Sequence, residues 1–391
     1  MTLADTSAWI LALPPLIALM IYILEVLIGL KPLPSLPGHT APPSIAVLIP
    51  AHNEARGIVA TIERLQQEMP AGSQILVVAD NCSDETASHA RQAGAEVAER
   101  TDPSRRGKGF ALAFGRDRLA SDPPEVVVVL DADCGFGAGG LAALASAARE
   151  VPAQAVNLLA PDRAAPPLVQ ISSFALVVKN LLRARATSRI GGAALLTGTG
   201  MAFPWSVFAD APLATGDLVE DLSLGLTLVR AGVRPQLVEG AHVRSRPAAQ
   251  TDALTQRKRW EHGFLSTALR TAPRLIVEGV RMGSRPRLAV GAHLLVPPLA
   301  LLFAMTFLVL AVVAGLGLLS GNWVPALALL AALAGACGAT LLAWLHVGRS
   351  WLTPVALLRA PLYILWKLPL YARFVVAPET RWLRTRRDGE S

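Results

Sequence analysis

The 391-residue chain has only three cysteines, Cys82, Cys134 and Cys337, and they lie far apart in sequence. An odd and sparse set argues against a disulfide framework and indicates a reducing compartment for the soluble part. The cysteines do not have the spacing of a zinc knuckle, and basic residues are not interleaved with aromatic ones as on a base-stacking surface. Although the net charge is +7, we therefore expect no nucleic-acid partner.

Formal charge is missing from several long stretches. Charged residues make up 17% of the chain and hydrophobic residues 52%, with a mean hydropathy of +0.44, which is too apolar for an ordinary soluble enzyme of this length. Residues 8–30 carry one charge, Glu25, and residues 288–319 and 324–347 carry none. Each stretch is long enough to cross a bilayer, so the sequence predicts three spans. A signal peptide is disfavoured because no basic segment precedes residue 8 and the apolar run is too long.

The distribution of basic residues predicts the orientation in the membrane. Lys31 follows the first span, which places residue 31 onward in the cytoplasm by the positive-inside rule and indicates a multi-pass protein of the cell inner membrane. Residues 351–376 contain three cations and three prolines, so we expect them to lie along or dip into the cytoplasmic interface, with the basic C-terminus inside. The predicted domains are 1–43 (first span and linker), 44–275 (catalytic domain) and 276–391 (C-terminal membrane domain).

Strands and helices are predicted to alternate from residue 44 onward. Strand candidates cover 45–49, 75–79, 96–99, 126–130 and 155–159, and helical stretches cover 57–69, 84–93, 108–119 and 139–150. This alternation predicts an α/β domain with a mostly parallel sheet and helices on both faces. Residues 166–191 join an apolar run to three arginines, which suits a helix at the membrane surface; a plain buried helix is the alternative.

Two carboxylates, Asp131 and Asp133, directly follow the apolar run 126–130. A continuous β-branched run is typical of a strand buried on both faces, and ligands bind beyond the carboxyl ends of such strands. One carboxylate could therefore face a nucleotide and the other a divalent cation, which prefers oxygen ligands. The alternative is a helix N-cap, where Asp is also favoured.

Three other polar clusters fall at the ends of predicted strands or the starts of helices. Pro50, Asn53 and Glu54 end the first strand, Asp80 ends the second, and Lys108 begins a helix. One ligand could touch all of them together with the aspartates. A Walker phosphate loop and a glycine fingerprint after the first strand are both absent from the sequence, which disfavours ATPases and nicotinamide enzymes.

These clusters recur in order with three later motifs: a glycine turn at 197–200, the pair Glu220-Asp221, and Gln-Arg-Lys-Arg-Trp at 256–260. The whole set resembles the membrane-bound members of glycosyltransferase family 2, which have the GT-A fold. They include cellulose, chitin and hyaluronan synthases, bacterial poly-N-acetylglucosamine synthases and ceramide glucosyltransferases. The resemblance covers about residues 44–270.

The resemblance implies a role for each matching residue. For the nucleotide-sugar pocket it implies Pro50, Asn53, Glu54, Asp80, Lys108 and Asp131. It implies Asp133 as the ligand of a divalent metal, Mg²⁺ or Mn²⁺, and the turn at Gly198 and Gly200, with Trp260, as the floor of the acceptor site. It implies Asp221 of the Glu220-Asp221 pair as general base, and Gln256, Arg259 and Trp260 as further catalytic residues.

The chemistry of glycosyl transfer independently requires these residue types. Charge builds on the departing diphosphate, where a metal and a cation such as Arg259 stabilise it, and a carboxylate must take the acceptor's proton. Each motif also has a structural alternative. Glu220-Asp221 suits a helix N-terminus, and Arg259-Trp260 suits a membrane-interface anchor. His242 could be an extra metal ligand, although a hydrogen-bonded structural histidine is the favoured interpretation.

Two departures from the family pattern concern the acceptor: Met201 to Phe203 bring no arginine after the glycine turn, and Val219 stands where threonine is common in cellulose synthases. We therefore predict an inverting transferase that moves a sugar from a nucleotide donor, UDP-linked by expectation, to a membrane-associated glycan in polysaccharide or oligosaccharide synthesis. The alternatives are transfer of a single sugar to a lipid, and a non-catalytic nucleotide-binding subunit of a secretion complex. A glycoside hydrolase is disfavoured because it needs no nucleotide pocket. Three spans are too few for a polysaccharide channel, so a glycan synthase would need a homo-oligomer or a separate exporter.

Overall fold

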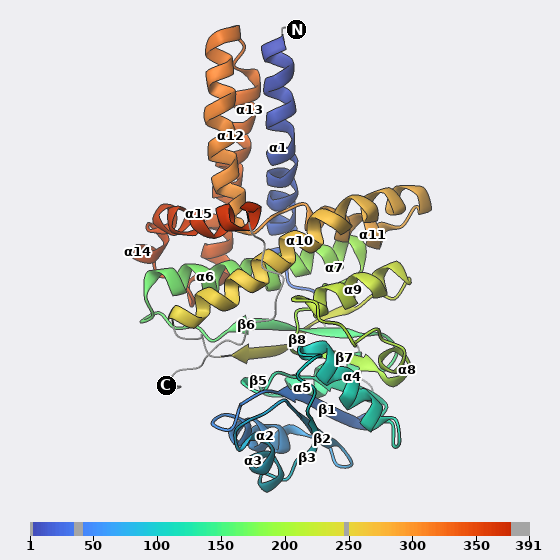
Figure 1. Cartoon of the computed structure of the whole chain (residues 1–391). Coiled ribbons are helices and arrows are strands. Elements are labelled where there is room, and N and C mark those ends of the chain that lie inside the picture. The colour runs from blue at the N-terminus through green and yellow to red at the C-terminus, as the bar shows by residue number, and fades with distance from the viewer. Residues whose placement is uncertain (1–2, 35–41, 246–249, 377–391) are drawn as a thin grey trace.

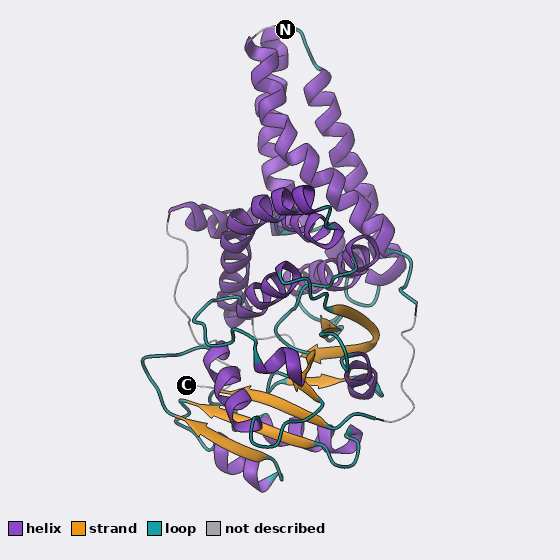
Figure 2. Cartoon of the chain, turned by 90° about the vertical axis from the view of Figure 1, so that its right-hand side faces the viewer, coloured by secondary structure: helices purple, strands orange, loops and turns teal. Residues whose placement is uncertain are grey.

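The computed structural model describes residues 3–34, 42–245 and 250–376, without the side chains of 250–258 and 375–376. It has three layers along its long axis (Figures 1 and 2): a bundle of long helices, a layer of crosswise helices, and a sheet domain flanked by shorter helices. The bundle consists of α1 (Leu3–Gly29), α12 (Leu299–Ser320) and α13 (Val324–Ala343), the last continued by a π-helical segment η2 (Trp344–Gly348). These three helices are long and apolar enough to cross a membrane.

The predicted second span, 288–319, is wrong in its first part. The chain forms α11 (Arg285–Leu294), breaks, and starts α12 only at Leu299, with Pro298 as its N-cap. Pro297 and Pro298 lack the backbone N–H that would continue the α11 hydrogen-bond ladder, so the helix ends before them. Figure 1 shows α11 in the crosswise layer rather than in the bundle.

The sheet domain contains the predicted βαβ alternation together with strands that the sequence pattern did not indicate. Its eight strands run in the order β3-β2-β1-β4-β7-β6-β8-β5. The predicted strands are β1 (Ile45–Ala51), β2 (Gln74–Asp80), β3 (Glu96–Arg100), β4 (Val126–Val129) and β6 (Ala153–Leu159). The unexpected ones are β5 (Cys134–Phe136), β7 (Met201–Pro204) and β8 (Gln236–Ser245). β1 pairs in parallel with β2 and β4, whereas β7 runs antiparallel to both β4 and β6, so the sheet is mixed.

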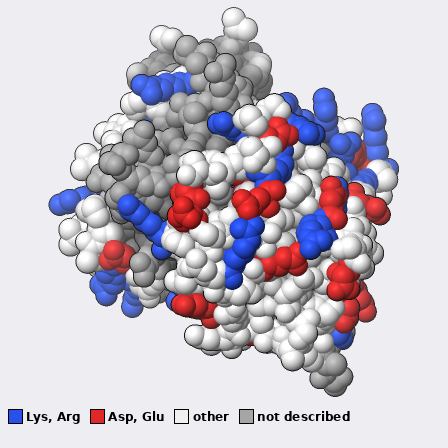
Figure 3. Space-filling view, turned by 60° about the horizontal axis from the view of Figure 1, so that its bottom comes forward, with Lys and Arg blue, Asp and Glu red and all other residues white. Residues whose placement is uncertain are grey.

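Helices cover both faces of the sheet, as predicted. The helices are α2 (Ile58–Glu68), α3 (Thr86–Gln92), α4 (Lys108–Leu119), α5 (Gly140–Ala147), α8 (Trp205–Ala209) and α9 (Glu220–Arg230). Alternate residues of β1 enter different cores: Ile45, Val47 and Ile49 pack with residues of α2 and α5, and Ala46 and Leu48 with residues of α4. The β-branched run of β4 is likewise fully buried, which explains its lack of polar alternation. On the face shown in Figure 3, the basic and acidic side chains of the described residues are interspersed.

The crosswise layer connects the sheet domain to the bundle. It contains α6 (Pro167–Val177), the π-helical turn η1 (Val178–Arg183), α7 (Ala184–Gly191), α10 (Gln250–Met282), α11, α14 (Pro354–Leu357) and α15 (Ala360–Val376). Three arginines of η1 and α7 contact α1 and the loop after it. Arg183 donates to Glu25 at 2.5 Å, Arg185 donates to the Gly29 carbonyl at 3.1 Å, and Arg189 donates to the Ile28 carbonyl at 2.7 Å. The two backbone contacts satisfy carbonyls that the end of a helix leaves unpaired.

Candidate active site

The carboxyl ends of β1, β2 and β4 bring the predicted donor residues to one edge of the sheet. Asn53 adopts a positive φ of 57°, and its amide joins the loop after β2, donating to Ser83 Oγ at 3.1 Å and accepting from the Ser83 N–H at 2.7 Å. The backbone N–H of Glu54 donates to Thr86 Oγ1 at 2.7 Å. Pro50 lies within β1 opposite Val78. The two loops are therefore fixed to one another at this edge.

Asp80 is held by a residue that the sequence patterns did not single out. The parallel register of β2 and β3 places Asp80 opposite Arg100, and Arg100 donates to Asp80 Oδ1 at 2.6 Å. The same guanidinium reaches Asp102 Oδ2 at 3.2 Å and lies over the Phe110 ring at 5.6 Å. Arg100 thus orients the carboxylate predicted to meet the base or ribose. The only signal in the sequence was its place at the end of a strand.

Lys108 links the donor edge to the glycine turn. Its ammonium forms an ion pair with Asp131 and donates to the Gly198 carbonyl at 2.6 Å. Burial alone would lower the pKa of Lys108, but the carboxylates of Asp131 and Glu220 outweigh it and the pKa is raised. Lys108 is therefore a fixed positive charge among three carboxylates, the third being Asp221.

The glycine turn lies directly against Asp221. Gly198 and Gly200 have φ of +85° and +63°, a region that residues with a Cβ rarely adopt. A Cβ on Gly198 would come within 3.2 Å of Asp221 Oδ2, and one on Gly200 within 2.6 Å of Val243 Cγ2. Buried Gln154 fixes the turn, donating to the Thr199 carbonyl at 2.9 Å and accepting from the Thr197 N–H at 2.9 Å. Glycine is thus required here both by backbone conformation and by space.

Glu220 and Asp221 begin α9 and have perturbed acidities. Burial raises the pKa of Glu220 to about 7, and the adjoining Asp221 carboxylate adds to the rise. Burial also raises the pKa of Asp221, against the opposing effects of the Leu222 N–H and of Lys108. The helix N-terminus therefore does not hold these two groups as ordinary surface carboxylates. A carboxylate with a raised pKa at this place is a stronger base.

Asp131, Asp133 and Cys134 place one potential ligand atom each within 4.8 Å of one another. Burial, with the Asp133 carboxylate next, raises the pKa of the Cys134 thiol well above its usual value, so the thiol stays protonated and donates to Asp133 Oδ1 at 3.5 Å. The two carboxylates supply the oxygen ligands that a hard cation such as Mg²⁺ or Mn²⁺ prefers. His242 is not among these grouped ligand atoms.

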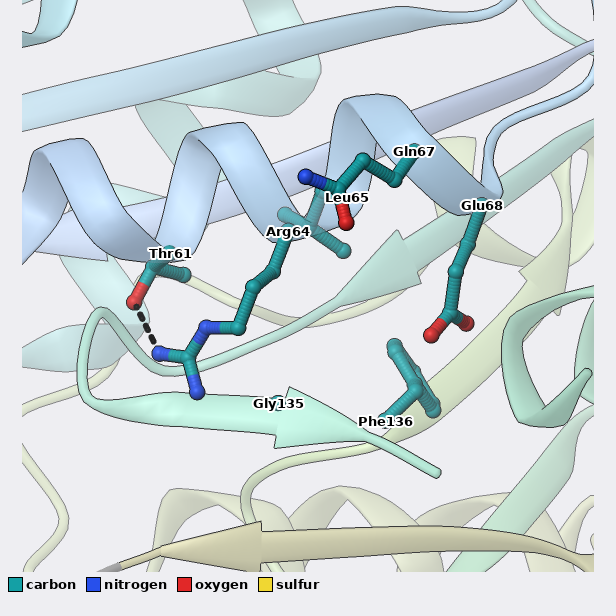
Figure 4. A pocket seen from close by; sticks show the side chains of 7 residues that line it. All are labelled: Thr61, Arg64, Leu65, Gln67, Glu68, Gly135 and Phe136. Atoms are coloured by element: carbon teal, nitrogen blue, oxygen red, sulfur yellow. Dashed lines mark hydrogen bonds between the residues drawn. The ribbon is translucent and has the colours of Figure 1, made fainter. Parts of the chain in front are cut away.

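The loop that carries the two aspartates is supported from behind by α2. Buried Thr61 donates through Oγ1 to the Ala132 carbonyl at 2.8 Å and accepts from Arg64 at 3.4 Å. Figure 4 shows these two side chains beside a small hollow between α2 and β5, which is also lined by Glu68 and Phe136. A helix on the far side of the loop therefore limits its movement.

The residues of the 256–260 motif lie on α10. Arg259 is half-buried, and Trp260 is 40% exposed. Burial lowers the pKa of Arg259, while the carboxylates of Glu220 and Asp131 act in the opposite direction. The side chain of Gln256 lies outside the described residues. The structure thus gathers Lys108, Asp131, Gly198, Glu220, Asp221 and Arg259 into one electrostatic cluster, with Asp133 beside it.

Comparison with known proteins assigns this arrangement to a family. The model described as "Glycosyltransferase like family 2" matches residues 42–263. An uncharacterized glycosyltransferase of Mycobacterium tuberculosis is 34% identical over 98 residues, which is 25% of this chain and 40% of that protein. The match thus spans about two fifths of the length of that relative.

Solved structures show the same fold. The structure of a mannosyltransferase from Pyrobaculum calidifontis in complex with GDP-mannose and Mn²⁺ superposes with a TM-score of 0.56 at 21% identity, covering 94% of this chain and 100% of that one. A glucosyl-3-phosphoglycerate synthase from Mycobacterium tuberculosis, in complex with Mn²⁺, UDP and phosphoglyceric acid, gives a TM-score of 0.40 at 21% identity over 57% of this chain and 78% of that one. The fit to the Pyrobaculum structure confirms the predicted GT-A fold. That structure contains Mn²⁺, and this chain has an Asp-x-Asp motif of its own.

Proposed function

The chain belongs to glycosyltransferase family 2 and is a glycosyltransferase, and we propose that it moves a sugar from a UDP-linked donor to a membrane-associated glycan in polysaccharide or oligosaccharide synthesis. The observation that carries the proposal is the contact of Lys108 with both Asp131 and the Gly198 carbonyl, next to Asp221. That contact brings the predicted donor, acceptor and base residues within reach of one substrate pair.

The donor binds at the edge of the sheet formed by the carboxyl ends of β1, β2 and β4. Pro50, Asn53, Glu54 and Asp80 surround the nucleoside, and Lys108 and Asp131 lie on its ribose and base side. Asp133, beside Asp131, would hold Mg²⁺ or Mn²⁺, and the metal would supply positive charge to the diphosphate. In support, the two neighbouring structures described above contain Mn²⁺ together with a nucleotide or nucleotide sugar.

Transfer is a single displacement at the anomeric carbon, with inversion. The acceptor hydroxyl oxygen forms the new bond to the anomeric carbon, the bond from that carbon to the phosphate oxygen breaks, and the proton passes to the Asp221 carboxylate. The raised pKa of Asp221 makes it a stronger base than a solvent-exposed aspartate. Arg259 supplies positive charge to the departing diphosphate, and Trp260 offers a flat apolar surface to a sugar ring.

The membrane arrangement follows from the three apolar helices. We assign α1, α12 and the α13–η2 helix as spans of the cell inner membrane, with the sheet domain on the cytoplasmic side because Lys31 and the arginines of the crosswise layer lie at that end of α1. Helix α15 runs crosswise at the base of the bundle (Figure 1), which supports an interfacial position for residues 351–376. The domain limits 1–43, 44–275 and 276–391 remain predictions, and the last boundary falls within α10.

A lipid acceptor that receives one sugar is the second candidate. It is favoured by the number of candidate spans among the described residues, because three helices cannot by themselves enclose a polysaccharide channel. The glycan proposal then requires a homo-oligomer or a separate exporter, whereas a lipid can reach the site sideways from the bilayer. A non-catalytic subunit would need neither, but it would release no nucleoside diphosphate.

Mass spectrometry of the products separates these candidates. Purified protein in nanodiscs is supplied with Mn²⁺, a panel of UDP-sugars and an extract of membrane lipids. A ladder of products differing by one sugar supports glycan synthesis, and a single added sugar on a lipid supports the second candidate. Both candidates would be contradicted if no UDP-sugar in the panel, and no GDP-sugar in a wider panel, gave release of nucleoside diphosphate.

A further inference from the structure

The α10 segment that carries Arg259 and Trp260 is packed directly against the start of α9. A Cβ on Gly263 would lie 2.8 Å from Val219 Cγ1, so the two helices approach as closely as a glycine permits. Val219 is the N-cap of α9, directly before Glu220 and Asp221. Any shift of this part of α10 therefore changes the distance between Arg259 and the two carboxylates.

The side of the same segment away from α9 is clamped by α15. Lys367 forms an ion pair with Glu261, and both side chains are largely buried, at 4% and 17% exposure. His262 Nε2 lies 3.1 Å from the Leu370 carbonyl, and its ring meets that of Phe374 edge-on at 5.2 Å. Glu261 and His262 directly follow Arg259 and Trp260 in the chain, so α15 contacts the catalytic segment itself.

The opposite face of α15 is apolar and uncovered. Leu362 and Leu365 are 62% and 60% exposed, whereas Tyr363 and Lys367 on the inner face are buried. Helix α15 also packs against α12, one of the three helices apolar enough to span a membrane. Figure 1 shows α15 crosswise at the base of that bundle. A bilayer around the three apolar helices would therefore end at the level of α15, where its leucines are exposed.

We propose that the Glu261–Lys367 pair is a positioning contact through which α15, docked on the bilayer surface, holds Arg259 and Trp260 in place over the donor. The proposal rests on the transferase function given above. In this proposal the boundary between lipid headgroups and acyl chains covers the exposed face of α15, and turnover depends on that contact. A helix docked by its leucines cannot rotate freely, so its inner face presents Lys367 at a fixed height to α10.

The test breaks and then reverses the pair in protein held in nanodiscs. Glu261→Gln and Lys367→Met should each lower kcat by about 10²-fold with little change in donor KM, because misplacing a catalytic group by about 1 Å costs that much in rate. The reversed pair, Glu261→Lys with Lys367→Glu, should recover most of the loss, and Lys367→Arg should lose little. Glu278→Gln is the matched control, since it breaks an α10 ion pair to Arg230 at 2.6 Å near the other end of the helix. Full turnover in both single variants would overturn the positioning role.

Hydrogen exchange provides a readout that needs no activity. The amides of 259–264 should exchange faster in the single variants than in the wild type or the reversed pair, with β1 and β4 unchanged. If the wild-type protein released no nucleoside diphosphate while this difference persisted, the transferase proposal would fail and the clamp would stand. Equal exchange in all variants would remove the clamp and leave the transferase proposal intact.

The bilayer contact is tested separately. Leu362→Asn combined with Leu365→Asn should lower kcat in phosphatidylcholine–phosphatidylglycerol nanodiscs as the single pair variants do. Phe114→Asn is the control, because Phe114 is a 37% exposed aromatic residue of α4 in the sheet domain. Wild-type turnover from the double leucine variant would show that α15 does not need the bilayer.

Discussion

The donor edge and the membrane-facing side of the site are built from contacts of different range. At the donor edge, Asn53 meets Ser83 across 30 positions and Arg100 meets Asp80 across 20. On the membrane side, Arg183 meets Glu25 across 158 positions, and Lys367 meets Glu261 across 106. The contacts of the donor edge are therefore made between segments close in sequence within the sheet domain. The membrane side forms only when both ends of the chain have reached the crosswise layer.

Replacing the proposed base should produce the largest effect. It also tests whether Asp221 acts on the acceptor or belongs to the donor edge. Asp221→Asn should lower kcat by about 10²- to 10⁴-fold while donor affinity stays unchanged, because Asp221 acts on the acceptor. Steady-state kinetics and UDP titration calorimetry measure the two quantities, with Glu220→Gln as the neighbouring control. A loss of UDP affinity as large as the loss of rate would move Asp221 to the donor edge.

Breaking a buried ion pair of the membrane side should destabilise the protein. Arg183→Met removes the guanidinium partner of Glu25, whose side chain is 5% exposed, and leaves that carboxylate only its contact with His293 at 2.8 Å. We expect this to lower the free energy of unfolding by about 3–5 kcal/mol. Arg118→Gln, which breaks the exposed pair with Glu96 in the sheet domain, should cost less than about 1 kcal/mol. Chemical unfolding in detergent micelles compares the two. Equal losses of unfolding free energy would mean that the buried long-range pair contributes no more to stability than the exposed pair in the sheet domain.

The pH profile tests the coupling of the two carboxylates. Because burial raises the pKa of Glu220 to about 7 and also raises that of Asp221, the pair holds a proton at a pH where ordinary carboxyls are ionised. The base works only when ionised, so the raised pKa of Asp221 should place the acid limb of kcat at a higher pH than an exposed aspartate would give. Glu220→Gln removes one negative charge and should move this acid limb to lower pH. An acid limb at the same pH in this variant would show that the ionisation of Glu220 does not affect that of Asp221.

The same raised pKa has the opposite effect on stability. The folded state binds the Glu220 proton more tightly than the unfolded chain, so this group's contribution to stability is greatest at low pH. That contribution decreases as the pH rises from the ordinary value of 4.5 to about 7. The difference in unfolding free energy between the wild type and Glu220→Gln, measured across this window, should follow that decrease. If the difference in unfolding free energy did not change with pH, the raised pKa of Glu220 would be contradicted.

The smallest effect is expected at the donor edge. Asn53→Ala loses the amide contacts to Ser83 and must hold a φ of 57° with a Cβ, which should cost about 1–2 kcal/mol and weaken UDP binding. Asn53→Gly keeps the backbone conformation and loses only the amide, so it should cost less. UDP affinity by calorimetry compares them. If glycine were worse than alanine, the positive φ would not matter there.

What could be predicted from the sequence follows the same division. β1, β2 and β4 were predictable because their apolar runs end in polar clusters, and Lys108, Asp131 and Asp133 follow from that pattern. β5 is only three residues long, too short for periodicity to indicate. Arg100, Gln154 and Lys367 could not be recognised, because their partners are set by register or by packing between distant segments. The wrong second span came from composition alone, which did not weigh Pro297 and Pro298 as a break.

Nucleoside diphosphate release from wild-type protein and Asp133→Asn, with Mn²⁺ titrated in nanodiscs, tests the central claim most directly. The claim is metal-dependent transfer from a nucleotide sugar by this site. It predicts saturable Mn²⁺-dependent release in the wild type and loss of most of it in Asp133→Asn, since a neutral amide is a poor ligand for a hard cation. The exposed carboxylate variant Asp122→Asn should behave as wild type. Unchanged release by Asp133→Asn at saturating Mn²⁺ would contradict the account.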